Sequence, residues 1–203
     1  MPAPDSLLFR IYRYRTLFLW CLIVFALDQI TKAWIDATLP FNTYYEPGRI
    51  TVIPSLFHIV HVGNTGAAWG LFAGKSLWLA VLAMITLCAI FVFRRQLELS
   101  RPLVQIIFGL LCGGIVGNLV DRLIHGHVID FIQVPQWPTF NVADIAITMG
   151  VACVLAAQVV GSGGGLLARI DFFHWEVGEV RNEEEGCRGA GGRAHPPSTR
   201  HAL

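Results

Sequence analysis

The chain has 203 residues, of which 54% are hydrophobic and only 14% are charged, and its formal net charge is +1. A soluble domain usually carries about 25% charged residues, so this composition argues against a soluble globular enzyme and against a disordered protein. A net charge near zero provides no overall basic field, and no nucleic-acid partner is expected. We infer that much of the chain lies in lipid.

Four apolar stretches follow one another along the chain, and each is long enough with its flanks to cross a bilayer, which takes about 20 residues. None shows the polar stripe of a core helix in a soluble protein. The first resembles a signal peptide at its start, but it continues through Asp28 and Lys32 without a clear cleavage site, so a retained anchor is expected. The stretches are residues 17–35, 77–93, 103–120 and 145–160.

Arginine placement predicts the orientation of these spans, because Lys and Arg are enriched in cytoplasmic loops. Basic residues precede the first span, separate the second from the third and follow the fourth. Both termini are therefore expected in the cytoplasm, with four spans and two outer loops. The arginines that carry this argument are Arg10, Arg13, Arg15, Arg94, Arg95, Arg101 and Arg169.

Two segments lack the character of a membrane span. Residues 38–63 hold prolines between short β-branched and aromatic runs, which predicts a small sheet. That sheet is expected at the outer surface, because open strand edges do not occur in hydrocarbon. Residues 169–203 are polar and are predicted to form a disordered cytoplasmic tail. The chain is thus expected to consist of a membrane domain, residues 1–168, and this tail.

Polar side chains near the spans converge on one level. In the predicted orientation the first and third spans run outward and the fourth starts outside, so their polar ends meet at the outer face. A charge at membrane depth is costly and tends to mark function. The residues concerned are Asp28, Lys32, Asn118, Asp121, Arg122, Asp130, Asn141 and Asp144.

Most of these residues also have a purely structural interpretation. Asn141 makes a good N-cap, with Asp144 in the first turn of the fourth span. Asp28 and Lys32 are spaced i, i+4 and can form an ion pair on a helix surface. Asp121 can simply end a helix near the headgroups.

Asp130 is harder to explain in this way, because it lies in an apolar run with no adjacent base and no helix to cap. If it meets Asp144 in a low-dielectric site, the two carboxyl groups cannot both ionise easily and share a proton. Such a pair can activate water as a general base and protonate a leaving amine as a general acid. Asp121 is a reserve candidate, since it also lies on the outer side.

Three further patterns carry less chemistry. Glycines along the third span predict close helix packing. Two histidine pairs on the outer side make a zinc site conceivable, but no full ligand set is evident and no metal is expected. The cysteines scattered through the apolar runs are interpreted as buried free thiols. The glycines are Gly109, Gly113, Gly114 and Gly117, and the histidines are His58, His61, His125 and His127.

Two other classes of protein remain open from the residues alone. A small transporter or channel would use the buried acids as an ion path, but it predicts polar residues through the whole membrane depth. The second apolar stretch is almost wholly apolar, and the acids lie on one side only. A non-catalytic lipid-binding or assembly protein with a lipid-facing sheet is the other alternative.

Five sequence blocks resemble the bacterial lipoprotein signal peptidase family, also called signal peptidase II. The blocks occur in the family's order over about four fifths of the chain, and together they are highly specific although each alone is weak. They are DQITK at 28–32, NTGAA at 64–68, GNLVDR at 117–122, VIDF at 128–131 and FNVAD at 140–144.

The resemblance implies a mainly α-helical membrane protein with four transmembrane helices and an extracytoplasmic β-sheet cradle at about residues 38–63. It implies an aspartic dyad of Asp130 and Asp144. The residues expected to support the dyad or bind substrate are Asp28, Lys32, Asn64, Gly66, Asn118, Arg122 and Asn141.

The same resemblance implies an aspartic endopeptidase of the bacterial inner membrane with its active site on the outer side. Such an enzyme removes the signal peptide from diacylglyceryl-modified prolipoproteins by cleaving before the lipidated cysteine. It uses no metal or organic cofactor, it works in contact with membrane lipid, and globomycin-type peptides inhibit it. A monomer is expected. The tail after residue 168 is longer than the family core needs.

Overall fold

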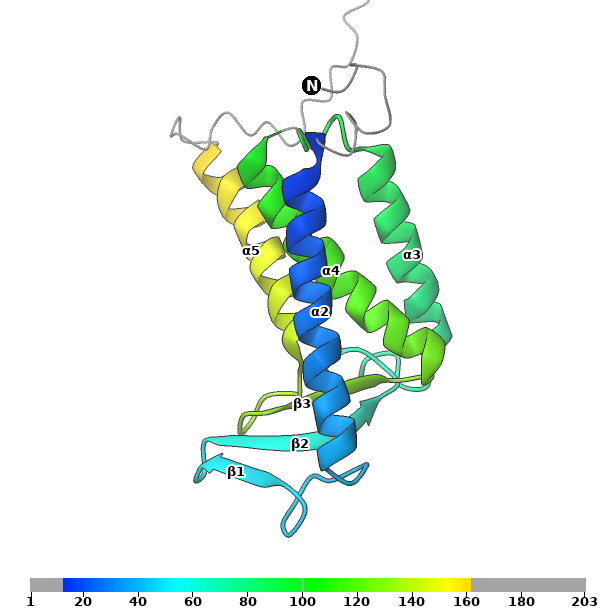
Figure 1. Ribbon diagram of the computed structural model, residues 1–203, viewed down its shortest axis with the longest axis vertical. Coiled ribbons are helices and arrows are strands. Elements are labelled where there is room, and N and C mark those ends of the chain that lie inside the picture. Colours follow the sequence, from blue (N-terminus) through cyan, green and yellow to red (C-terminus); the bar gives the residue numbers. More distant parts are fainter. Residues whose placement is uncertain (1–12, 100, 162–203) are drawn as a thin grey trace, which may run out of the picture. The chain divides into compact units, whose positions relative to one another are not determined.

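The computed structural model describes residues 13–99 and 101–161 (Figure 1). The predicted tail at 169–203 lies outside the described residues. In chain order the elements are α2 (Arg15–Thr38), β1 (Ile50–Ile53), β2 (Phe57–Asn64), the 3₁₀ turn η1 (Ala68–Gly70), α3 (Ser76–Val92), α4 (Pro102–Ile124), β3 (Val128–Gln133) and α5 (Val142–Gly161).

Three of the helices, α2, α4 and α5, are long and apolar enough to cross a membrane. They coincide with the first, third and fourth apolar stretches of the sequence. The second stretch forms α3, an apolar helix of 17 residues that is shorter than a full span. Within the described ranges, the length and composition of the helices therefore confirm three of the four predicted spans.

The central helix is α4, which packs against α2, α3 and α5. Its glycines permit this close packing. A Cβ added to Gly113 would lie 2.7 Å from the Val24 Cβ of α2, and one added to Gly114 would lie 2.5 Å from the Ala143 carbonyl oxygen of α5. The glycines of α4 therefore allow close packing of two neighbouring helices, as the sequence predicts.

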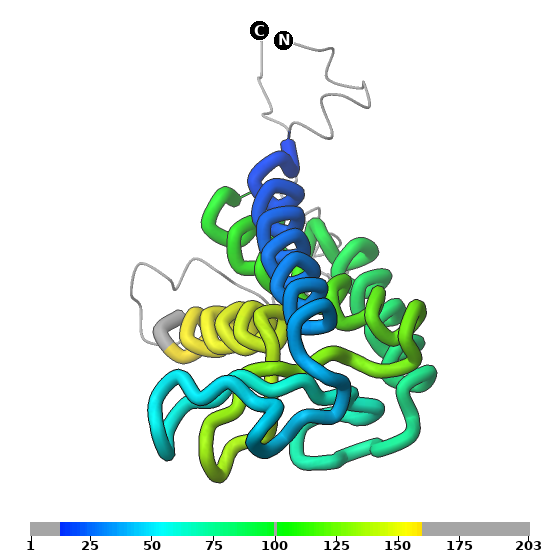
Figure 2. Tube along the Cα trace, turned by 60° about the horizontal axis from the view of Figure 1, so that its bottom comes forward, coloured from blue at the N-terminus to red at the C-terminus, as the bar shows by residue number. Residues whose placement is uncertain are grey.

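The sheet is antiparallel, with the strand order β1-β2-β3. The hairpin of β1 and β2 falls in the region predicted to form a sheet, but β3 was not predicted. In the register of β2 and β3, Val62 pairs with Asp130 and Asn64 pairs with Val128. The sheet contacts α2 and α4 at one end of the helices, and Figure 2 shows its strands crossing below them. This pairing brings Asp130 to the helix ends.

Candidate active site

The strand β3 carries Asp130 to the end of the helix group. Its neighbours Ile129 and Phe131 are buried and pack against apolar side chains of α2. Because successive side chains of a strand point to opposite faces, these two residues direct Asp130 away from that apolar cluster. The Asp130 side chain is nevertheless almost fully buried, since the residue is only 1% exposed.

The Asp130 carboxylate accepts two side-chain hydrogen bonds, from Asn64 Nδ2 at 2.9 Å and from Asn141 Nδ2 at 2.7 Å. Burial is the largest influence on this group, and the charge of nearby Asp144 adds to it. Together they raise the pKa of Asp130 to about 7, against the two hydrogen bonds, which lower it. This carboxyl group can therefore hold a proton at neutral pH.

Asp144 lies in the first turn of α5, where it forms a reciprocal cap with Asn141. The Asp144 backbone N–H donates to Asn141 Oδ1 at 2.9 Å, and the Asn141 backbone N–H donates to Asp144 Oδ2 at 3.2 Å. Asn118 of α4 donates from Nδ2 to the other carboxylate oxygen at 2.8 Å. The capping interpretation is therefore confirmed, but Asn141 also contacts Asp130. One asparagine thus joins both acids.

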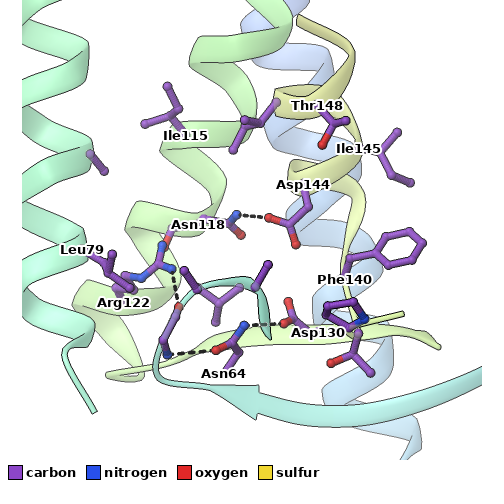
Figure 3. A pocket seen from close by; sticks show the side chains of 18 of the residues that line it. Asn64, Leu79, Ile115, Asn118, Arg122, Asp130, Phe140, Asp144, Ile145 and Thr148 are labelled. Atoms are coloured by element: carbon purple, nitrogen blue, oxygen red, sulfur yellow. Dashed lines mark hydrogen bonds between the residues drawn. The ribbon is translucent and has the colours of Figure 1, made fainter. Parts of the chain in front are cut away.

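Both acids line a single cavity of about 720 Å³ between the sheet and the helices α3, α4 and α5. Figure 3 shows Asp130 and Asp144 at the polar end of this cavity, with apolar side chains farther along the helices. The cavity therefore offers two carboxyl groups next to a space that suits an apolar ligand. Its apolar walls include Leu79, Leu82, Ala83, Ile115, Ile145, Ile147 and Met149.

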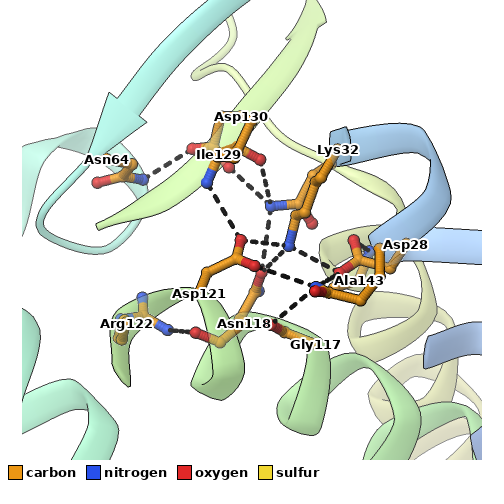
Figure 4. A network of polar contacts seen from close by, with 12 residues as sticks. Asp28, Lys32, Asn64, Gly117, Asn118, Asp121, Arg122, Ile129, Asp130 and Ala143 are labelled. Carbon is orange, nitrogen blue, oxygen red and sulfur yellow. Dashed lines mark hydrogen bonds and ion pairs between the residues drawn. The ribbon is translucent and has the colours of Figure 1, made fainter. Parts of the chain in front are cut away.

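A second group of charges lies just behind the dyad and is wholly buried (Figure 4). Lys32 Nζ lies 2.7 Å from Asp28 Oδ2 and 2.8 Å from Asp121 Oδ2, and it donates to Asn118 Oδ1 at 3.0 Å. The predicted pair of Asp28 and Lys32 is thus present, but it is buried and includes a third charge. Asp121, the reserve catalytic candidate, is the partner of this lysine.

These buried charges connect the elements that carry the dyad. Asp28 accepts a hydrogen bond from the Ala143 backbone N–H at the start of α5, at 2.9 Å. Asp121 accepts one from the Ile129 backbone N–H of β3, at 3.2 Å. The group therefore ties α2 and α4 to both the helix that bears Asp144 and the strand that bears Asp130.

Arg122 ties the last turn of α4 to the segment that follows β2. Its Nη2 donates to the Gly66 carbonyl at 3.1 Å, and its Nη1 donates to the Asn118 carbonyl at 3.3 Å. The Gly66 backbone N–H donates in turn to Asn64 Oδ1 at 2.9 Å. A Cβ on Gly66 would lie 2.6 Å from the Leu71 carbonyl oxygen, so a glycine is needed here. All the residues expected at the site thus form one connected set of contacts.

Gln29 is a member of this set that the sequence analysis did not single out. Its Nε2 donates to Asp121 Oδ1 at 3.0 Å and to Asp28 Oδ2 at 3.3 Å. Gln29 lies between Asp28 and Lys32 in an otherwise apolar span, and this position could have indicated a role at the site.

None of His58, His61, His125 and His127 lines the cavity that holds the two acids. His61 contacts the Leu39 carbonyl through Nδ1 at 3.0 Å, and His58 contacts the Thr51 hydroxyl through Nδ1 at 3.2 Å. Between residues 13 and 161, leaving out residue 100, no three side chains of His, Cys, Asp or Glu gather around one point.

Comparison with known proteins places this arrangement in a family. The family model described as signal peptidase (SPase) II matches residues 20–160. A lipoprotein signal peptidase of Thermosynechococcus vestitus is 41% identical over 143 residues, which cover 69% of this chain and 89% of that protein. The lipoprotein signal peptidase of Moorella thermoacetica is 40% identical over 134 residues, covering 66% of this chain and 85% of that protein.

A solved structure described as a bacterial membrane enzyme superposes on this chain with a TM-score of 0.66 and 31% sequence identity. The superposition covers 72% of this chain and 89% of that one. The family model spans most of the chain and includes every residue of the site described above. The chain therefore belongs to the signal peptidase II family and is a peptidase.

Proposed function

We propose that this protein is an aspartic endopeptidase in which Asp130 and Asp144 are the catalytic residues. It removes the signal peptide from diacylglyceryl-modified prolipoproteins and cleaves before the lipidated cysteine. One observation carries the proposal: the buried carboxyl group of Asp130 on β3 and the half-buried one of Asp144 on α5 share Asn141 at the polar end of an apolar cavity. The transporter and assembly-protein alternatives do not account for this arrangement in a peptidase family.

The proposed reaction needs one water molecule between the acids. Asp144, at the positive end of α5, is ionised and takes a proton from the water as its oxygen attacks the scissile carbonyl. Asp130 is protonated and donates a hydrogen bond to the developing oxyanion. Collapse of the tetrahedral intermediate breaks the C–N bond, and a proton from the dyad passes to the departing amine. The products are a signal peptide with a free carboxyl group and a lipidated cysteine with a free amine.

The supporting residues hold this geometry. Asn141 and Asn64 fix the Asp130 carboxyl group, and Asn118 fixes that of Asp144. Asp28 and Lys32 hold the elements behind the dyad. Arg122 and Gly66 place the segment after β2 beside the cavity, where it can contact the substrate backbone.

The membrane arrangement is part of the same proposal. The chain is a multi-pass protein of the inner membrane; α3 serves as the fourth span, both termini are cytoplasmic and the sheet lies on the outer side. The apolar cavity walls receive the signal helix and the acyl chains, while the sheet limits the entry of water. Catalysis belongs to residues 1–168, acting as a monomer in contact with membrane lipid, and globomycin-type peptides block it. The chemistry needs two carboxyl groups and water.

The test is a pair of isosteric substitutions, Asp130→Asn and Asp144→Asn. Each should reduce cleavage of a diacylglyceryl-modified prolipoprotein at least about a thousandfold, because loss of one member of a catalytic unit removes most of its effect. Asp36→Asn is the matched control, since this acid of α2 is 67% exposed and lies outside the site. Cleavage is measured with purified protein, and globomycin should inhibit the wild-type rate.

Two results would contradict the assignment. Cleavage retained by either variant would remove that acid from the dyad. Disappearance of either variant from the membrane, with unchanged Asp36→Asn, would indicate a structural role instead. Asp121→Asn tests the reserve candidate. Because Asp121 is a partner of Lys32, this substitution should reduce stability more than it reduces cleavage by the folded protein.

A further inference from the structure

Thr148 lies one turn after Asp144 on α5 and lines the same cavity. Four residues along a helix advance about 6 Å and return almost to the same face. Because α5 runs away from the sheet, Thr148 is deeper among the helices than the dyad, and Figure 3 shows it on the cavity side of α5. Its hydroxyl therefore faces the apolar part of the cavity.

The Thr148 hydroxyl has no hydrogen-bond partner among the described residues. A threonine within a helix commonly satisfies its hydroxyl by donating to the carbonyl four residues earlier. Thr86, which lines the cavity from α3, does so by donating to the Leu82 carbonyl at 2.9 Å. Thr86 and Thr148 line this cavity from α3 and α5, and of these two helix residues Thr148 is the one with a free donor.

Thr148 is exposed and lines the cavity, so its free hydroxyl gains from an acceptor on a ligand that fills this apolar space, where an unpaired polar group is unfavourable. Its neighbours in the cavity wall include Ile145, Met149 and Ile115, which supply none. The backbone carbonyls of a helical signal peptide are satisfied within that helix. The glycerol esters on the substrate cysteine are acceptors a few bonds from the scissile amide, a separation comparable with one helical turn of about 5.4 Å.

We propose that Thr148 binds an ester carbonyl of the diacylglyceryl group and makes the enzyme prefer a diester lipid to a diether lipid at the substrate cysteine. The inference rests on the proposed function, because it assumes that the cysteine is held at the dyad. It adds a residue that recognises the linkage between glycerol and the lipid chains, whereas the apolar walls contact only the acyl chains.

The experiment compares two precursors that differ only in the lipid linkage, one with diacylglycerol and one with dialkylglycerol on the cysteine. The full chain should cleave the diester with a kcat/KM about fivefold higher, the ratio that one net hydrogen bond produces. Thr148→Val should bring this ratio close to one, mainly by raising KM for the diester. Thr148→Ser should restore the preference, and Thr86→Val should keep the wild-type ratio.

Equal cleavage of both precursors by the wild type would overturn the inference, as would a wild-type ratio in Thr148→Val. If that variant does not accumulate, Thr148→Ala removes the same hydroxyl and is judged by the same ratio. Equal loss of preference in Thr86→Val would also overturn it. Failure of the proposed function looks different, because the wild type would then cleave neither precursor.

Discussion

At the level of single residues, the two acids of the dyad differ in their surroundings. Asp144 occupies the first turn of α5 and accepts a backbone hydrogen bond there, and the positive end of a helix favours a negative charge. Asp130 instead lies on the strand β3 and not in the first turn of a helix. This asymmetry supports Asp144 as the ionised base and Asp130 as the protonated acid.

Activity should fall as the pH rises through about 7. The pKa of Asp130 is raised to about 7, so its carboxyl group is protonated below that pH and loses its proton above it. Since the proposed mechanism needs this proton, kcat/KM should decrease about tenfold for each further pH unit. The pH profile of prolipoprotein cleavage tests this, with intrinsic fluorescence recorded at each pH to verify folding. A rate that stays constant well above neutral pH in a folded protein would contradict it.

The substitution Asn141→Ser should distinguish the role of Asn141 as the N-cap of α5 from its proposed role in catalysis. Serine is a good N-cap, so α5 should keep its stability, but serine is too short to donate to Asp130 as the asparagine amide does. Cleavage should fall about a hundredfold, the usual loss when one preorganised donor is removed from an active site. The melting temperature should stay near that of the wild type. A parallel loss of stability and activity would show that the contact of Asn141 with Asp130 is structural rather than catalytic.

At the level of elements, the buried charges of α2 and α4 determine how β3 and α5 meet. Lys32 lies between two carboxylates, and each of these accepts a backbone hydrogen bond from the element that bears Asp130 or Asp144. A buried charge that loses its partner is strongly unfavourable, so this group acts as a unit. It specifies one arrangement of the four elements.

Lys32→Met should destabilise the protein by about 3–5 kcal/mol, because it leaves Asp28 and Asp121 buried without their shared cation. Thermal unfolding in detergent measures the effect. Lys75→Met is the matched control, since that lysine is exposed just before α3. Adding Asp28→Asn and Asp121→Asn to Lys32→Met should recover part of the stability. An unchanged melting temperature for Lys32→Met would show that the pair is not buried as described.

The elements also show how far the sequence could predict the structure. Apolar runs predicted the helices, because lipid imposes a simple requirement on each segment separately. The strand β3 was missed, because it is defined by pairing with β2, more than 60 residues earlier. The pair of Asp28 and Lys32 could be predicted, because its two members are only four residues apart on one helix. The contact of Lys32 with Asp121 was not, so Asp121 and Asp130 could not be told apart by residue type.

At the level of the whole molecule, the described part of the chain separates polar and apolar functions along the helices. The charged and amide side chains of the site gather where the sheet meets α2, α4 and α5, and the cavity becomes apolar away from the sheet. A substrate with a polar scissile segment and an apolar helix matches both ends at once. Under the proposed function, the reaction therefore takes place at the sheet end of the candidate membrane helices.

Removal of residues 169–203 should leave prolipoprotein cleavage within about twofold of the full chain, since chain termini are common sites of tolerated change. All the site residues lie between Asp28 and Asp144, and the family model ends at residue 160. Purified full-length and truncated proteins are compared for kcat/KM on one precursor in the same detergent.

A longer truncation provides the contrast. Removing residues from 152 onward also deletes Ala157, which is buried against Val104 and Phe108 of α4. Because α5 holds Asp144 through its packing on α4, this second truncation should lose both stability and cleavage. If removal of residues 169–203 alone abolishes cleavage while the protein stays folded, catalysis requires the tail, and the assignment of the whole activity to residues 1–168 is wrong.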